Sequence, residues 1–107
     1  MTKQTHIEFS AMPWDCPRQG HQQKVILRGT QKLRLLRFAD DFVEEHWCTN
    51  GHIGFVVDGE MTIDFNGSSS HYKKGDALWI ESGEAEKHKV LIAKGKFVEL
   101  ILFEESD

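Results

Sequence analysis

The chain has 107 residues, of which 39% are hydrophobic and 28% charged, and its formal net charge is −4. This length is typical of one domain around one core, and the apolar content is too high for a disordered chain. We therefore expect a single domain over residues 1–107. The acidic balance and the scattered Lys and Arg residues argue against a nucleic-acid partner. No stretch approaches the roughly 18 apolar residues of a membrane span, and no secretory signal is apparent, so we expect a cytoplasmic protein with no membrane partner.

The first residues differ in composition from the rest. Residues 1–23 hold both prolines, Pro13 and Pro17, together with Trp14. Because proline is poorly tolerated in central strands, this segment is predicted to be an extended arm that packs on its own domain or on a partner subunit.

From Lys24 onward, short apolar runs alternate with Gly, Asp, Asn or Ser. This rhythm is typical of a β-sandwich or β-barrel, and no window shows the 3.6-residue apolar period of a long helix. The sequence therefore predicts an all-β fold with six or more antiparallel strands. The predicted strands cover residues 25–27, 33–38, 52–57, 61–65, 76–80, 88–93 and 97–103.

Glycine-containing turns separate these runs. Asp58-Gly59 predicts a tight hairpin, because glycine accepts the positive φ that short connections require. Residues 66–70, 74–75 and 94–96 predict three further turns. The acidic end of the chain, residues 104–107, is expected to be a solvated tail.

Good metal donors gather before the most apolar part of the chain. His46, Cys48 and His52 have the same parity, so an extended backbone would direct them to one face. A bulge at residues 50–51 would change that register. Later in the chain, His88 follows a glycine-containing loop, and Glu86 shares its parity.

Imidazole and thiolate are strong ligands for zinc and other first-row transition metals. The sequence therefore predicts a metal site built from His46, Cys48, His52 and His88. A nucleophilic pair of Cys48 with His46 or His52 is an alternative, because an adjacent imidazole can deprotonate a thiol. That alternative leaves His88 unused.

Several basic residues form a loose patch early in the chain. Such a patch could bind an anionic ligand, although charges of this kind usually form a solvated sheet face. The residues are Lys24, Arg28, Lys32, Arg34 and Arg37.

Two segments resemble the signature motifs of small single-domain cupins. They are HIGFVVDGE at residues 52–60 and GDALWIESG at residues 75–83. The family motifs run G-x5-H-x-H-x3,4-E-x6-G and G-x5-P-x-G-x2-H-x3-N, and the resemblance covers roughly residues 30–103. It implies a cupin-type double-stranded β-helix, which is a jelly-roll barrel.

The resemblance also implies a ligand set for the first motif. Gly59 matches its closing glycine, which places His52 where the family usually has Glu. Cys48 then takes the place of the second family His, and His46 takes the place of the first. Each departure replaces one metal donor by another.

The second motif matches less closely. Gly75 and Gly83 have the family separation, but Glu81 stands where Pro is usual. Glu86 occupies the position of the family His, and His88 comes two places later. Either residue could complete the site, and His88 suits a nitrogen- and sulfur-rich donor set better.

The cupin fold hosts many activities, so the site must decide the function. We expect a metal-binding cupin that binds or transforms a small polar molecule at a transition-metal site inside the barrel. A nonenzymatic ligand-binding or sensing module with a structural metal is the alternative. Zinc is favoured by the thiol of Cys48, with nickel, iron and manganese left open. The resemblance also implies a homodimer.

Overall fold

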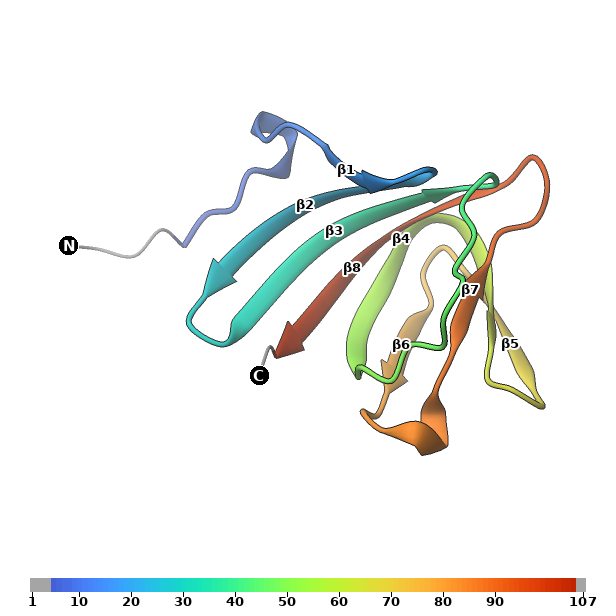
Figure 1. Cartoon of the computed structure of the whole chain (residues 1–107). Coiled ribbons are helices and arrows are strands. Elements are labelled where there is room, and N and C mark those ends of the chain that lie inside the picture. Colours follow the sequence, from blue (N-terminus) through green and yellow to red (C-terminus); the bar gives the residue numbers. More distant parts are fainter. Residues whose placement is uncertain (1–4, 106–107) are drawn as a thin grey trace.

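The structure is a computed structural model that describes residues 5–105 (Figure 1). Its regular secondary structure consists of strands and two short 3-10 helices, η1 at Phe9–Ala11 and η2 at Glu84–Glu86. The strands are β1 (Asp15–Arg18), β2 (His21–Arg28), β3 (Gln31–Ala39), β4 (His52–Asp64), β5 (Ser69–Lys73), β6 (Ala77–Ile80), β7 (Lys89–Leu91) and β8 (Phe97–Glu105). The all-β prediction is confirmed.

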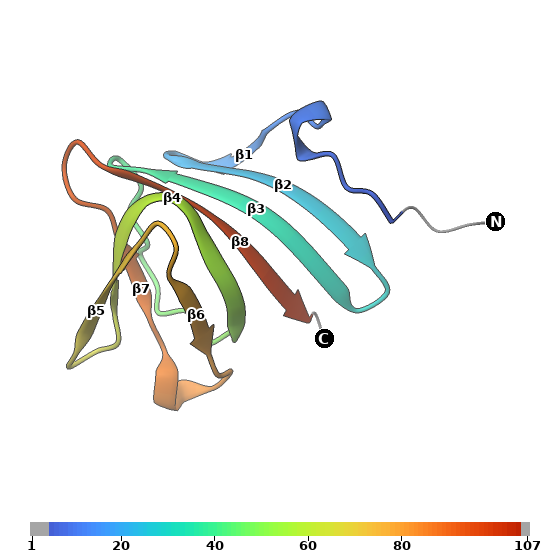
Figure 2. The same cartoon turned by 180° about the vertical axis from the view of Figure 1, so that it is seen from behind.

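The strands form one curled antiparallel sheet. Its order is β1-β2-β3-β8-β4-β5, and β6 and β7 also pair with β4. Two opposite views show that β1, β2, β3 and β8 form one broad wall (Figures 1 and 2). Strands β5, β6 and β7 lie on the other side of β4 and form the second wall. The sheet therefore encloses an interior as a half-barrel.

The long strand β4 joins the two walls. Its first residues pair with β6 and β8, whereas its last residues pair with β5 and β7. The predicted hairpin at Asp58-Gly59 is wrong, because both residues lie within β4. Val56 pairs with Leu100 and Asp58 pairs with Glu99, so an extra residue stands between them as a β-bulge.

Gly59 follows this bulge with a φ of +77°. A Cβ at this position would lie 2.1 Å from the carbonyl oxygen of Phe97. Gly59 is therefore required by the bulge and by the close approach of the Phe97 backbone. Because a tight turn also favours Asp-Gly, the sequence alone does not distinguish the two cases.

Alternate residues of the central strands fill the interior. In β8 the even-numbered residues face inward, and the buried apolar side chains of the core come from β3, β4, β6 and β8, together with Phe42. The most completely buried of them are Leu36, Met61, Ile63, Val56 and Val98.

The predicted turns at residues 74–75 and 94–96 connect strands as expected, whereas only residues 66–68 of the turn predicted at 66–70 do so, because Ser69 and Ser70 belong to β5. The N-terminal segment also packs on its own sheet. The Lys24 ammonium donates to the carbonyl oxygen of Phe9 at 2.7 Å and lies 4.5 Å from the centre of the Trp14 ring. Within the predicted arm, Asp15–Arg18 form the edge strand β1 and His21 begins β2. Residues 1–4 of that arm lie outside the described part.

Candidate metal centre

Three of the predicted donors converge on one point inside the half-barrel. One donor atom from each of Cys48, His52 and His88 lies within 4.8 Å of the others. The Cys48 Sγ is 3.7 Å from the His52 Nε2. Two imidazoles and one thiol at this separation can bind a single first-row transition metal ion.

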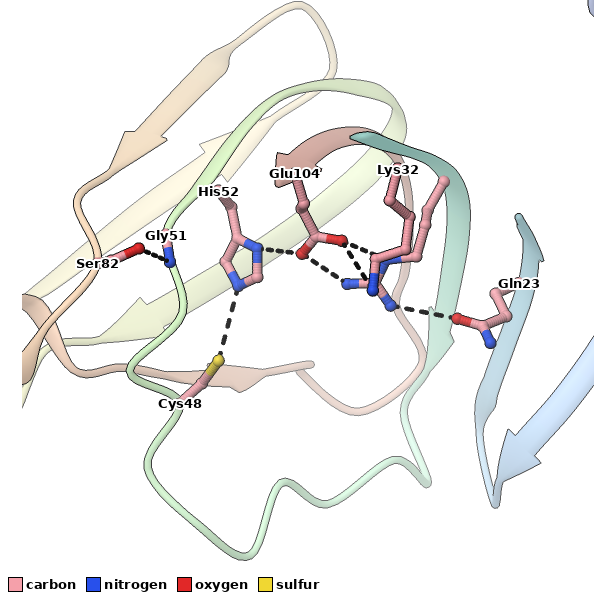
Figure 3. A network of polar contacts seen from close by, with 8 residues as sticks. Gln23, Lys32, Cys48, Gly51, His52, Ser82 and Glu104 are labelled. Atoms are coloured by element: carbon pink, nitrogen blue, oxygen red, sulfur yellow. Dashed lines mark hydrogen bonds and ion pairs between the residues drawn. The ribbon is translucent and has the colours of Figure 1, made fainter. Parts of the chain in front are cut away.

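Backbone contacts alone hold these three residues close together. His52 is the first residue of β4, and Cys48 lies in the preceding loop. Cys48 and His88 form an isolated antiparallel bridge, with N–O distances of 2.9 and 3.0 Å. The loop is held by Gly51, whose N–H donates to the Ser82 hydroxyl at 2.8 Å (Figure 3).

Both imidazoles direct the same nitrogen toward the thiol. The His52 Nδ1 forms an ion-pair contact with the carboxylate of Glu104, and Figure 3 shows the ring between Glu104 and Cys48. The His88 Nδ1 is 3.0 Å from the carbonyl oxygen of Glu86, which can only accept. Each Nδ1 therefore holds a proton, so Nε2 is the nitrogen that can bind a metal once it has lost its own proton. Such outer hydrogen bonds commonly orient metal-binding histidines.

Glu104 is a site residue that the sequence did not predict. It is 8% exposed and accepts two hydrogen bonds from the Arg34 guanidinium, at 2.7 and 2.8 Å. The expectation of a solvated tail is wrong at this residue, because β8 extends to Glu105. The alternation of side chains along the strand could have predicted its inward position, since Glu104 continues the inward-facing series of Leu100 and Leu102.

The contacts within the cluster shift its protonation states. Hydrogen bonding to His52 and His88 lowers the pKa of the Cys48 thiol to about 6. Burial disfavours the charged form of His52, but its contacts with Cys48 and Glu104 outweigh burial and raise its pKa to about 9. The thiol is thus ionised near neutral pH, which is the form that binds metals.

Two neighbouring groups are shifted as well. Burial opposes the charge of Glu104, but hydrogen bonds from His52 and Arg34 lower its pKa to about 2. Burial also opposes the charge of His88, yet its contacts with Cys48 and the Glu86 carbonyl raise its pKa. Glu104 therefore remains a carboxylate that can hold the His52 ring.

The structure does not bring His46 into the cluster. His46 is exposed and lies outside any strand, and residues 46–51 form a loop rather than an extended continuation of β4. The prediction that His46 and His52 face the same side required one continuous strand, and no strand joins the two residues. Glu86 also stays outside, because its carboxylate accepts a hydrogen bond from the Glu81 N–H at 2.6 Å.

The three donors line a cavity of about 260 Å³. Leu36, Met61 and Leu100 form part of its apolar wall. Arg18 and His21, from β1 and β2, line the same cavity. A small molecule in this space would touch both the donor cluster and the basic residues.

Comparison with known proteins identifies the fold. No protein-family model and no curated protein sequence matches the chain. Among solved structures, the polyketide cyclase RemF from Streptomyces resistomycificus superposes with a TM-score of 0.80 at 16% identity, covering 100% of this chain and 81% of that one. KdgF from Halomonas sp. gives a TM-score of 0.76 at 19% identity, covering 99% and 96% of the two chains.

An RmlC-like cupin from Shewanella frigidimarina NCIMB 400 gives a TM-score of 0.76 at 13% identity, covering 98% of this chain and 93% of that one. These matches and the curled antiparallel sheet show that the chain has the cupin fold. The resemblance found in the sequence is thereby confirmed for the fold. None of the helices in residues 5–105 is long and apolar enough to cross a membrane.

Proposed function

We propose that this chain is a metal-binding cupin protein that binds or transforms a small polar molecule at a transition-metal site inside the barrel. One observation carries the proposal: Cys48, His52 and His88 present their donor atoms within 4.8 Å of one another on the wall of a cavity. The proposed ligands are the Cys48 Sγ and the Nε2 atoms of His52 and His88.

The number of donors favours an open site over a closed structural one. Within residues 5–105, no fourth His, Cys, Asp or Glu side chain joins this group. Structural zinc sites usually have four protein ligands, whereas catalytic sites have three and leave a position for a small molecule. The cavity beside the donors gives such a molecule room.

The chemistry of the donors suits zinc, although nickel, iron and manganese also accept imidazole ligands. A bound divalent ion would act as a Lewis acid toward an oxygen atom of the small molecule. Among the residues of the chain, Cys48 supplies a thiolate, and the Glu86 carbonyl and Glu104 carboxylate hold the two rings in the ligating orientation.

Metal content in matched variants tests the proposal. We expect elemental analysis of the purified protein to give one metal ion per chain, and His52→Ala and Cys48→Ser to lose most of it. His46→Ala and Cys16→Ser are the matched controls, because His46 and Cys16 are both exposed and lie outside the cluster. Full occupancy in the His52 variant would refute the site.

Chelation separates an open site from a structural one. For an open site, we expect removal of the metal to abolish binding of the small molecule while the β-sheet circular dichroism spectrum is retained. Global unfolding on chelation would instead support the structural role, because binding energy at such sites is folding energy.

We also propose that the chain forms a homodimer through the outer face of the sheet. Ile53, Phe55, Trp79 and Phe103 are exposed there, and Ile53 pairs directly with both Trp79 and Phe103. A continuous apolar patch of this kind suits a two-fold interface. We expect light scattering to show a dimer that Trp79→Lys dissociates, whereas Leu91→Lys, on β7, leaves it intact. A monomeric wild-type protein would refute this interface.

A further inference from the structure

The wall of the cavity also carries polar groups that the proposed metal centre does not use. His21 begins β2, and Arg18 ends β1 directly across from it. Both residues line the same cavity as Cys48, His52 and His88. A molecule that fills the cavity therefore meets a basic end as well as the donor end.

His21 is a buried polar side chain that packs against aromatic rings. It is 6% exposed, and neither ring nitrogen has a hydrogen-bond partner within residues 5–105. The ring packs against Phe38 and Phe42, with centroid distances of 4.9 and 5.8 Å. Buried polar atoms normally have partners, and an unpaired one is costly. A ligand in the cavity can supply the missing acceptor.

Arg18, unlike His21, is exposed, and it forms no close ion pair within residues 5–105. Its guanidinium lies 5.2 Å from the centre of the Phe42 ring, and within the described part of the chain no carboxylate oxygen comes within 4 Å of it. The planar guanidinium of arginine matches the two oxygens of a carboxylate. Arg18 is thus available to bind an anion.

The net charge of the residues that line the cavity also favours an anionic ligand. Its lining includes the cations Arg18, Lys32 and Arg34 against the carboxylates Glu44 and Glu104. Glu104 is already paired with Arg34, and the Glu44 carboxylate accepts a hydrogen bond from the Val90 N–H at 2.7 Å. A net positive cavity attracts anions and disfavours cations.

We propose that the cavity binds a small carboxylic acid, with its carboxylate held by Arg18 and His21 and a second oxygen-bearing group directed to the Cys48–His52–His88 centre. The inference deepens the proposed function and rests on it only for the end of the ligand that meets the metal. The volume of about 260 Å³ restricts the ligand to a compact molecule, since it lies near the lower end of ordinary ligand pockets.

Binding of short dicarboxylates tests this inference. Malonate, succinate and glutarate are titrated by calorimetry into the zinc-loaded protein, and their neutral diamides serve as isosteric controls. We expect one of the three acids to bind at least about tenfold more tightly than its diamide, since hydrogen bonds to charged groups are the stronger ones. Equal binding of acid and diamide would overturn the inference.

Variants then locate the carboxylate. We expect Arg18→Gln and His21→Phe each to weaken binding of the preferred acid by about tenfold or more. Arg37→Gln is the matched control, because Arg37 lies 4.8 Å over the Phe97 ring in the same kind of contact but does not line the cavity. His21→Phe keeps the aromatic packing. Loss of affinity in the Arg37 variant equal to that in the Arg18 variant would also overturn the inference.

The same titrations in metal-free protein distinguish this inference from the proposed function. If the wild-type chain binds no metal, the proposed function fails, yet a dicarboxylate that still binds through Arg18 would uphold the inference. If metal is bound but the acids show no dependence on Arg18 or His21, the inference fails and the metal centre stands.

Discussion

Cys48 and His88 are joined by two backbone hydrogen bonds, although one lies in the loop before β4 and the other just before β7. The bridge fixes the separation of their Cα atoms independently of the side chains. Two of the three candidate donors are therefore brought together by the fold itself, and a metal ion would meet a site that is already assembled.

We expect the metal-free protein to retain its fold for this reason. Removal of the metal with a chelator should leave the far-ultraviolet circular dichroism spectrum unchanged while lowering the melting temperature, because a ligand that binds only the native state stabilises it. The melting temperature of Cys48→Ser should not respond to the chelator. A response in this variant as large as in the wild type would contradict the assignment.

Glu104 should tune metal affinity without ligating. We expect Glu104→Gln to weaken zinc binding by about ten- to a hundredfold, the usual effect of removing a partner that orients a ligating histidine. Competition with a chromophoric chelator measures the affinity. Glu105→Gln is the matched control, since Glu105 is the exposed neighbour at the end of the same strand. An unchanged affinity in Glu104→Gln would remove its positioning role.

The ionised thiol of Cys48 should be reactive when no metal is bound. Because its pKa is lowered to about 6, iodoacetamide at pH 7 should modify Cys48 in the metal-free protein, and zinc should protect it. Cys16 is an exposed free cysteine in the same chain, and its labelling should not depend on zinc. Mass spectrometry of the two peptides reads both sites. Zinc-independent labelling of Cys48 would exclude it from the ligand set.

His21 should make the stability of the protein sensitive to mild acid. Burial, together with Arg34 and Arg18, lowers its pKa from 6.5 to about 4. The unfolded chain therefore binds a proton that the native chain does not, and the free energy of unfolding falls as the pH drops from 6.5 toward 4. The full loss is about 3 kcal/mol, since one pKa unit corresponds to about 1.4 kcal/mol.

Urea denaturation at pH 7, 5.5 and 4.5 measures this loss. Stopping at pH 4.5 keeps the experiment above most of the range in which Glu104 protonates, because its pKa is lowered from 4.5 to about 2. In His21→Phe the decline should be much smaller. A decline as steep as in the wild type would assign the acid sensitivity to another group.

The bulge in β4 should tolerate no side chain at Gly59. Gly59→Ala combines a positive φ with a Cβ only 2.1 Å from the Phe97 carbonyl oxygen, and we expect it to destabilise the fold by more than about 2 kcal/mol. Gly29→Ala is the control, because Gly29 also has a positive φ but no atom lies within 4 Å of the position that its Cβ would take. Equal melting temperatures for the two variants would contradict the steric argument.

Local sequence patterns predicted the fold well, because strand alternation and turn glycines act over a few residues. They failed at Asp58-Gly59, where a turn and a bulge require the same residue types. The pairing of Val56 and Asp58 with β8 decides between them, and that pairing joins segments far apart in the sequence.

Only the residue types of the metal donors could be predicted from the sequence, and not their arrangement. Cys48, His52 and His88 were named from residue type, and the structure brings them together. His46 was included through strand parity, but its backbone is not extended with β4. Glu104 was missed because its role depends on Arg34 and His52, which reach it from two neighbouring strands.

The position of Glu104 near the end of β8 has a practical consequence. The residue that orients the His52 ring belongs to the last strand, and only Glu105 follows it within β8. Removal of the last two residues of β8 would therefore act directly on the candidate metal centre, although it would leave every proposed donor in place.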